Sequence, residues 1–239
     1  MYKDKKTEKY CYFEHSDDAN KGIKEFESYK DAILYQMEKH IDCNRNVGNL
    51  INEDILKVNL NEIIMENKKD GKIKNVKIVA NLPYYITTPI IMKLLEEKLD
   101  IKSITVMIQK EVADRLIETP GGKNTGAITH TVYYYCESEK IMEVPNSSFI
   151  PEPEVTSKVI KLNIRKETAV KPKDKEKMFK IIKYAFMQKR KTLLNSLTNN
   201  GVFKNKTQGT EILNSLGIKE NVRPEELTLE QFEKISDNL

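Results

Sequence analysis

The sequence has few of the residues that build metal sites or disulfide frameworks. Its three cysteines, at positions 11, 43 and 136, are widely spaced and form no C-x-x-C pair. The three histidines, at positions 15, 40 and 130, do not complete a metal-ligand spacing with them. This pattern predicts a protein that holds no metal ion and whose thiols stay reduced, as is usual in the cytoplasm.

Long apolar runs are also missing. No segment approaches the length that a membrane-spanning helix needs, and the first ten residues (MYKDKKTEKY) lack the apolar core of a signal peptide. We therefore expect a cytoplasmic protein that is not inserted in a membrane.

The composition is that of a globular protein with an uneven charge. In 239 residues, 39% are apolar, which is enough for a core, and the length predicts one large or two small domains. The net charge of +4 conceals a basic block, because residues 166–206 contain 12 Lys or Arg against 3 Asp or Glu. Such a block is usually a solvated helix face, but it also fits a polyanionic partner.

The chain divides into three parts by pattern. Residues 1–46 are polar, with one helix expected over 19–40, and form a divergent N-terminal segment. Residues 47–168 alternate between helical and strand patterns, which predicts an α/β domain. Thr88 is expected to cap a helix that has Pro89 as its first residue. After Pro172 only helical patterns follow, so residues 169–239 are expected to form a small all-α domain.

The individual elements of the α/β part follow from periodicity and from breaking residues. Residues 127–136 fit a helix and a strand equally well. The expected strands are 76–80, 104–108, 140–144 and 158–164, and the expected helices are a short one near 60–64, one over 88–97 and one over 110–118.

One short motif, Asn81-Leu82-Pro83-Tyr84, has a chemistry suited to an exocyclic amine. It follows a buried strand, and open α/β sheets bind ligands at the carboxyl ends of their strands. The side-chain carbonyl of Asn81 and the backbone carbonyl of Leu82 could accept both N–H hydrogens of such an amine. Pro83 fixes φ, and Tyr84 offers a face on which a planar base can stack. A strand-end turn with no such role accounts for these four residues about as well.

Several segments together resemble the family of ribosomal RNA adenine dimethyltransferases that modify two adjacent adenines near the end of small-subunit rRNA. They occur in the family's order and cover residues 50–239. The matching segments are NEDIL (52–56), VANLPYYITTPIIMKLL (79–95), IQKEVADRL (108–116), SSFIPEPEVTSKVIKL (147–162), AFMQKRKTLLNSL (185–197) and RPEELTLEQF (223–232).

The resemblance implies a fold and a set of partners. The fold would be a Rossmann-like methyltransferase sheet, N-terminally incomplete, followed by a small all-α C-terminal domain. The activity would be methylation of adenine N6 with S-adenosylmethionine as donor. The partner would be small-subunit rRNA within an immature small ribosomal subunit, and we expect the chain to act as a monomer.

The resemblance also implies roles for single residues. Asn81 and Leu82 would bind the target amino group, while Tyr84 and Phe149 would contact the flipped adenine from its two sides. A lone acidic residue after a strand is more often a helix cap, but in NEDIL the residues Asp54 and Ile55 would hold the adenine of S-adenosylmethionine, with Asn81 beside it. The basic residues Lys189, Arg190 and Lys191 would contact RNA phosphates.

The chain departs from the family in its glycines. The family holds the donor with an E-x-G-x-G-x-G turn, where the backbone must approach the ligand closely. Before Asn81 this chain has only Gly22, Gly48 and Gly71, and no G-x-G occurs in its first 80 residues. Two alternatives to the small-subunit enzyme therefore stay open. One is a catalytically impaired fragment that binds rRNA or pre-ribosomes. The other is another methyltransferase class, such as the large-subunit rRNA adenine enzymes.

Overall fold

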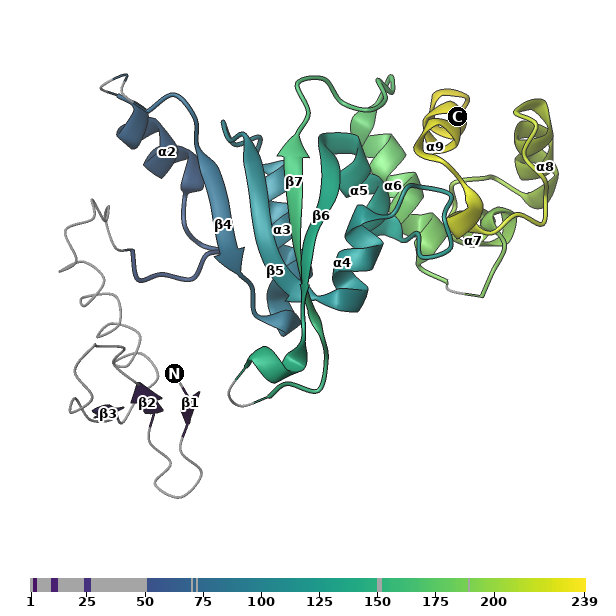
Figure 1. Cartoon of the computed structure of the whole chain (residues 1–239). Helices are drawn as coiled ribbons and strands as arrows, with labels where there is room; N and C mark the ends of the chain where they lie inside the picture. The colour runs from purple at the N-terminus through teal and green to yellow at the C-terminus, as the bar shows by residue number, and fades with distance from the viewer. Residues whose placement is uncertain are drawn as a thin grey trace. The chain divides into compact units, whose positions relative to one another are not determined.

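The computed structural model describes residues 51–239 except 70, 72, 150, 151 and 189, together with three short strands in the first 50 residues (Figure 1). These strands, β1 (Tyr2–Lys3), β2 (Tyr10–Tyr12) and β3 (Lys24–Phe26), pair antiparallel in the order β1-β2-β3. The helix predicted over 19–40 is wrong for residues 24–26, whose backbone pairs with β2 instead. The remainder of segment 1–46 lies outside the described residues.

The described chain forms two compact units. The first unit consists of residues 1–54 and 145–154, and includes the 3₁₀ turn η2 (Asn146–Ser148). The second unit consists of residues 55–144 and 155–239 and contains the large sheet and the α-helices that the structure describes.

The second unit alternates helices and strands and then continues with helices alone. In chain order its elements are α2 (Leu60–Lys68), β4 (Lys77–Asn81), the 3₁₀ turn η1 (Tyr84–Ile86), α3 (Thr87–Glu96), β5 (Ser103–Gln109), α4 (Lys110–Ile117), α5 (Ala127–Tyr135), β6 (Cys136–Val144), β7 (Ser157–Ile164), α6 (Lys175–Phe186), α7 (Leu193–Asn199), α8 (Lys206–Ser215), η3 (Pro224–Glu226) and α9 (Leu229–Asp237).

The sheet of the second unit has the strand order β4-β5-β7-β6. β4 and β5 are parallel, whereas β7 runs antiparallel to both β5 and β6. The register places Asn81 beside Met107, and it places Ser157 opposite Gln109. The carboxyl ends of β4 and β5 therefore meet the amino end of β7 at one edge of the sheet.

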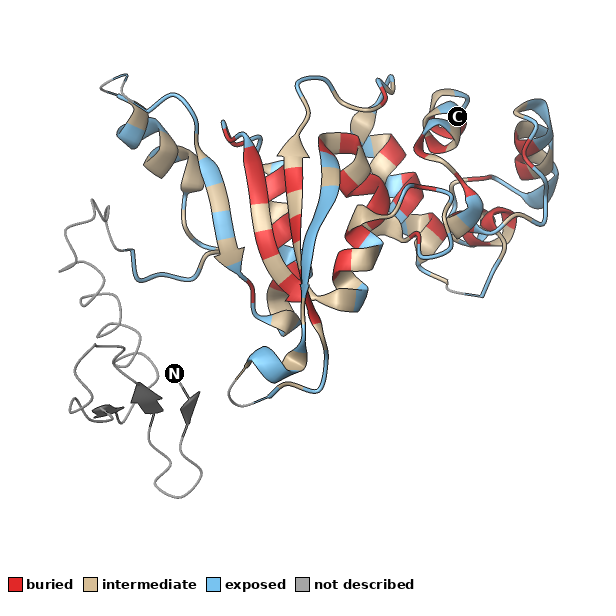
Figure 2. Cartoon of the chain, in the orientation of Figure 1, coloured by how far each residue is buried: buried red, intermediate tan, exposed pale blue. Residues whose placement is uncertain are grey.

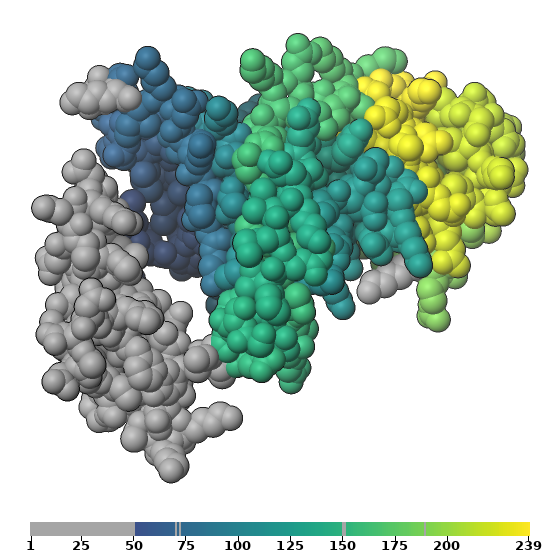
Figure 3. Space-filling view, viewed as in Figure 1, coloured from purple at the N-terminus to yellow at the C-terminus, as the bar shows by residue number. Residues whose placement is uncertain are grey.

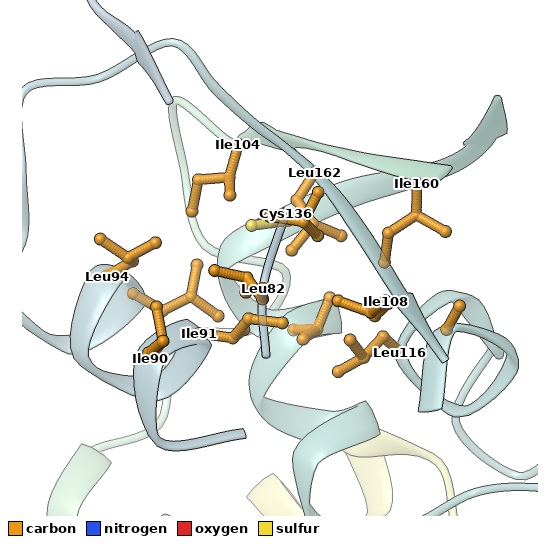
Figure 4. Close-up of a cluster of buried hydrophobic side chains, with 14 of the residues drawn as sticks. Leu82, Ile90, Ile91, Leu94, Ile104, Ile108, Leu116, Cys136, Ile160 and Leu162 are labelled. Carbon is orange, nitrogen blue, oxygen red and sulfur yellow. The ribbon is translucent and has the colours of Figure 1, made fainter. Parts of the chain in front are cut away.

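One face of this sheet is the core of the unit. Ile104, Ile108, Ile160 and Leu162 are completely buried because alternate residues of β5 and β7 point toward α3, α4 and α5 (Figures 2 and 4). Leu82 also belongs to this cluster, since its side chain is only 7% exposed. The segment that follows β4 is thereby anchored in the core.

The opposite face of the sheet is much less covered. Val79 on β4 is 78% exposed and Met142 on β6 is also exposed. Between them, the paired residues Met107 and Val159 are only partly buried. Among the described strands, β4 is an outer one, so its exposed side chains lie at the margin of the sheet (Figure 2).

The C-terminal helices form a second hydrophobic cluster. α6 contributes Met178 and Ile181, α8 contributes Leu213, and α9 contributes Phe232. Tyr134 on α5 belongs to the same cluster. Helix α5 therefore connects the C-terminal helices to the sheet within the second unit. Figure 3 shows the residues of α8 and α9, coloured yellow-green and yellow, at one end of this unit.

Helix α8 approaches its neighbours closely at Gly209. A β-carbon built there would lie 2.5 Å from Cδ1 of Leu194 and 2.6 Å from Cδ2 of Phe203. We expect Gly209→Ala to lower the free energy of unfolding by about 1–3 kcal/mol, because the overpacking outweighs the better helix propensity of alanine. Urea unfolding measures this change. The exposed Thr207→Ala on the same helix should change stability by less than about 0.5 kcal/mol. Equal effects of the two substitutions would contradict the close approach.

Most of the predicted elements are confirmed, one open alternative is decided, and one helix start differs from its prediction. Residues 127–135, which fitted helix and strand equally, form helix α5. The prediction that Thr88 caps a helix is wrong: α3 begins at Thr87, directly after η1. The Thr87 hydroxyl donates to the Pro83 carbonyl (3.0 Å), which joins the turn to the helix without a cap at Thr88.

No helix in the part of the chain that the structure describes is both long and apolar enough to span a bilayer.

Candidate active site

The backbone after β4 is fixed by hydrogen bonds on both sides of Leu82. The Leu82 amide donates to the Met107 carbonyl (3.2 Å), which continues the pairing of β4 with β5 by one residue. The next carbonyl, that of Pro83, accepts from the Ile86 amide (3.2 Å) and from the Thr87 hydroxyl. The turn is therefore held in place from the strand side and from the helix side.

Two carbonyl groups at the end of β4, which we call open, accept no hydrogen bond from the described residues. Asn81 is exposed at the end of β4. Among the described residues, neither its side-chain amide nor the backbone carbonyl of Leu82 takes part in a hydrogen bond. Successive open acceptors on a rigid strand end can bind the two hydrogens of one amino group.

The two tyrosines that follow differ in their surroundings. Tyr84 is partly buried, and its hydroxyl lies 2.7 Å from the hydroxyl of Ser157 on β7. Tyr85 is 88% exposed. The hydrogen bond from Tyr84 crosses from the turn after β4 to the start of β7, and so it ties the aromatic ring to the sheet.

The start of β7 is itself fixed by a polar cluster on the helix side of the sheet. Lys158 is almost completely buried and forms ion pairs with Asp114 on α4 and with Glu143 on β6. Hydrogen bonds from Lys140 and then from Lys110 lower the pKa of Glu143 to about 2. In addition, the backbone amide of Lys110 donates to the Thr156 carbonyl (3.0 Å).

Ser157 is a residue that the sequence did not single out. It lies within the segment SSFIPEPEVTSKVIKL, but a serine at a strand start gives no signal of its own. Its proximity to Tyr84 depends on the register of β7 against β5, which joins residues 73 positions apart in the chain.

Two other predicted site residues belong to the first unit. Phe149 directly follows η2, and its backbone amide donates to the Asn146 carbonyl (3.1 Å). Asp54 is exposed at the end of the N-terminal part, and Ile55 is the first residue of the second unit. A site shared by Phe149 and Tyr84, or by Asp54 and Asn81, stays a prediction.

The basic residues lie where two helices meet. Arg190 and Lys191 are exposed in the connection between α6 and α7, while Lys189 lies outside the described residues. Lys183, on α6, also lines a cavity of about 760 Å³ between α3, α5 and α6. Two further lysines of α6, Lys175 and Lys180, line the same cavity.

The described residues contain no group of three or more His, Cys, Asp and Glu side chains arranged to hold a metal ion. Cys136 is a free, buried thiol at the start of β6. Burial raises its pKa to about 12, so the thiol is protonated and unreactive at neutral pH.

Comparison with known proteins relates the whole of this region to one family. A family model described as ribosomal RNA adenine dimethylase matches residues 29–239. The ribosomal RNA small subunit methyltransferase A of Alkaliphilus oremlandii is 47% identical over 190 residues, which cover 80% of this chain and 65% of the relative. That of Lachnoclostridium phytofermentans is 48% identical over 189 residues, covering 79% of this chain and 64% of the relative. The chain thus spans slightly less than two thirds of the length of these relatives.

Solved structures show the same fold. The crystal structure of a dimethyladenosine transferase from Plasmodium falciparum superposes with a TM-score of 0.65 at 24% identity, covering 86% of this chain and 77% of that one. The 23S rRNA methyltransferase ErmE gives a TM-score of 0.61 at 19% identity, covering 87% and 78%. The predicted Rossmann-like sheet followed by C-terminal helices is therefore confirmed.

Proposed function

Since the chain belongs to the ribosomal RNA adenine dimethylase family, we propose that it dimethylates N6 of two adjacent adenines in small-subunit (16S) rRNA, as a step in small-subunit biogenesis. The methyl donor would be S-adenosylmethionine. The observation that carries this proposal is the pair of open carbonyl groups, of Asn81 and Leu82, at the carboxyl end of β4.

The two acceptors address the chemical difficulty of the reaction. The lone pair of an adenine amino group is delocalised into the ring, so the nitrogen is a poor nucleophile. Hydrogen bonds from both N–H groups to Asn81 and Leu82 favour a pyramidal nitrogen whose lone pair points away from the ring plane. The Leu82 carbonyl belongs to backbone that is fixed by the hydrogen bond from the Leu82 amide to Met107, so this acceptor needs little reorganisation during the reaction. The protonated product nitrogen is acidic enough to lose its proton to water, so the mechanism requires no general base.

The target adenine has to leave its stack before it reaches these acceptors. Tyr84 would offer it an aromatic face. Pro83, in an extended conformation (φ −60°, ψ 134°), precedes the turn that carries Tyr84. Phe149 would approach the base from the other side. Stacking on one such ring contributes about 1–3 kcal/mol, which offsets part of the cost of unstacking.

The described residues fit only part of the donor. S-adenosylmethionine supplies a methyl group on a sulfonium, and Asp54, Ile55 and Asn81 would hold it, with the Asp54 carboxylate accepting a hydrogen bond from the adenine amine. In the described part of the chain we find no glycine-rich turn that could approach the remainder of the donor. No reaction step is therefore assigned to residues on the donor side.

The helical part would supply affinity for RNA. Residues 169–239 are proposed as an RNA- and ribosome-binding domain, in which Lys189, Arg190 and Lys191 contact phosphates. Such contacts position a folded RNA without reading its sequence, so the shape of the RNA would determine which adenine reaches Asn81. We propose that the chain works as a cytoplasmic monomer. The relatives at 47–48% identity are named as small-subunit enzymes, which favours that target over large-subunit rRNA.

A second candidate function is supported by the glycines. Gly22, Gly48 and Gly71 are isolated in the sequence and do not form the glycine-rich turn with which the family holds the methyl donor. The chain therefore contains the residues proposed to bind the amine but not all of those that would bind the donor. A chain with this composition could bind rRNA or pre-ribosomes without transferring a methyl group.

Methyl transfer to immature small subunits that lack this modification tests the proposed function. We expect incorporation of radiolabelled methyl groups from S-adenosylmethionine, two per adenine at two adjacent adenines, located by mass spectrometry. Calorimetry distinguishes the two candidates: an absence of S-adenosylmethionine binding at millimolar concentration, with binding to the subunits retained, would leave only the binding module. If the chain bound neither ligand, both functions would be rejected.

A further inference from the structure

We propose that Ser157 is a positioning residue of the acceptor site, which acts by fixing the ring of Tyr84. The inference deepens the proposed function and rests on it, since Tyr84 matters here as the surface on which the target base stacks. The observation is the 2.7 Å distance between the two hydroxyl groups.

The ring of Tyr84 needs such an anchor because its backbone lies in a short turn. η1 has only three residues. Ile86 packs against the core, whereas Tyr85 is 88% exposed and Tyr84 is only partly buried, so the hydroxyl contact is a specific polar anchor for the Tyr84 ring. A tyrosine ring that is attached at Cα and bound at its hydroxyl is held at both ends of its long axis. The position of the long axis of the ring is then determined before a base arrives, which lowers the ordering cost of binding.

Ser157 is well suited to be the fixed partner. It is completely buried as the first residue of β7, and it is paired with Gln109 on one side and Val144 on the other. The adjacent residue, Lys158, is held by the ion pairs with Asp114 and Glu143. The anchor therefore belongs to the sheet and not to a loop. Its hydrogen bond fixes the hydroxyl end of Tyr84, in the turn after β4, relative to β7.

The hydrogen bond could instead serve stability alone, because a buried serine hydroxyl needs a partner. A stabilising role and a positioning role differ in what they change. Loss of stability lowers the amount of folded protein and leaves the KM of the folded fraction unaltered. Loss of positioning changes the KM or kcat for the RNA substrate at temperatures where every variant is fully folded.

Three variants of the full chain form the test, each measured for methyl transfer to immature small subunits: Ser157→Ala, Tyr84→Phe and the double substitution. We expect each single substitution to lower kcat/KM for the subunits about tenfold, as the loss of one hydrogen bond predicts. The double substitution should be no worse than either single one, because both remove the same interaction. Ser157→Thr keeps the hydroxyl and should retain more activity than Ser157→Ala.

The matched control is Ser103→Ala. Ser103 is also a buried serine at the start of a strand, but it lies at the opposite end of β5, beside Lys77 and Asn163. We expect it to leave kcat/KM unchanged. The proposal is overturned if Ser157→Ala has wild-type kcat/KM, if the effects of Ser157→Ala and Tyr84→Phe multiply in the double variant, or if Ser103→Ala causes the same loss.

A readout without catalysis separates this proposal from the proposed function. In protein labelled with ¹³C at tyrosine Cζ, the Tyr84 signal responds to a hydrogen bond with Ser157 whichever hydroxyl donates, and Ser157→Ala should shift this signal. If the wild-type chain transferred no methyl group, the proposed function would fail while this measurement still reported the anchor. An unchanged Tyr84 signal in Ser157→Ala would overturn the anchor itself, whatever the activity.

Discussion

Replacing Asn81 by alanine is expected to reduce methyl transfer to immature small subunits at least about a hundredfold, which is the typical cost of deleting one preorganised hydrogen-bonding group that acts on the reacting atoms. The amino group would keep one acceptor, the Leu82 carbonyl, and its nitrogen would stay closer to planar. Initial rates at saturating S-adenosylmethionine, with the concentration of subunits varied, measure the change.

The fold should tolerate this substitution, because Asn81 is exposed and its side chain has no hydrogen-bond partner among the described residues. The matched control is Lys77→Ala, at the other end of the same strand and on the same face, also exposed. Lys77→Ala should leave the rate within about twofold of wild type, as expected of a surface substitution away from the site. A fully active Asn81→Ala chain would show that the acceptor pair does not activate the amine.

Acidification is expected to destabilise the second unit through His130. This histidine of α5 is completely buried, and neither ring nitrogen has a hydrogen-bond partner in the part of the chain that the structure describes. Its ring packs edge-on against Phe232 (centroids 4.9 Å apart) and at a tilt against Phe186 (5.6 Å). Burial lowers its pKa from 6.5 to about 4.

The direction of the effect follows from this lowered pKa. Between pH 6.5 and 4 the unfolded chain binds a proton at His130 and the folded chain does not, so the free energy of unfolding falls as the pH falls. A difference of this size corresponds to about 3 kcal/mol, present in full above pH 6.5 and lost by pH 4. Such a loss is a large part of the stability of a typical domain.

His130→Leu isolates this contribution. Leucine cannot bind a proton and leaves no unpaired ring nitrogen, so the variant should be more stable than wild type, by an amount that grows as the pH is lowered from 6.5 to 4. Urea unfolding of both proteins across this range gives the difference curve. Carboxylates such as Glu143, whose pKa is lowered by its lysine partners, titrate alike in both proteins and cancel in the difference. A difference independent of pH would show that His130 is not buried as a neutral ring.

The elements of the second unit could be predicted where local patterns agree with the tertiary structure. The apolar runs at 76–80 and 104–108 became β4 and β5 almost within their predicted bounds, because strands buried on one or both faces need continuous or alternating apolar residues. The segment 127–136 was ambiguous because its Thr, Val and Tyr residues favour strands locally. Residues 127–135 nevertheless form a helix, because packing against α4 and α6 outweighs the local strand preference.

From chemistry alone, the sequence predicted only those parts of the site whose residues are neighbours in the chain. Asn81 to Tyr84 are neighbours in sequence, and their chemistry could be interpreted there. The partner of Tyr84 could not, since Ser157 reaches it only through strand register. The absence of a partner for His130 likewise depends on three helices that meet around it, and nothing in the sequence near residue 130 indicates it.

The role proposed for Leu82 has a consequence for how this site can change in evolution. Its side chain lies in the core beside Ile91 and Ile108 (Figure 4), while its carbonyl accepts no hydrogen bond from the described residues. A main-chain carbonyl has no side-chain substitution that alters its chemistry, and the side chain that holds it cannot vary without a cost in packing. In the proposed function, this half of the acceptor pair would be inherited with the fold. A change in the amine that the site accepts would then have to come from substitutions of Asn81 or of the aromatic residues proposed to contact the base.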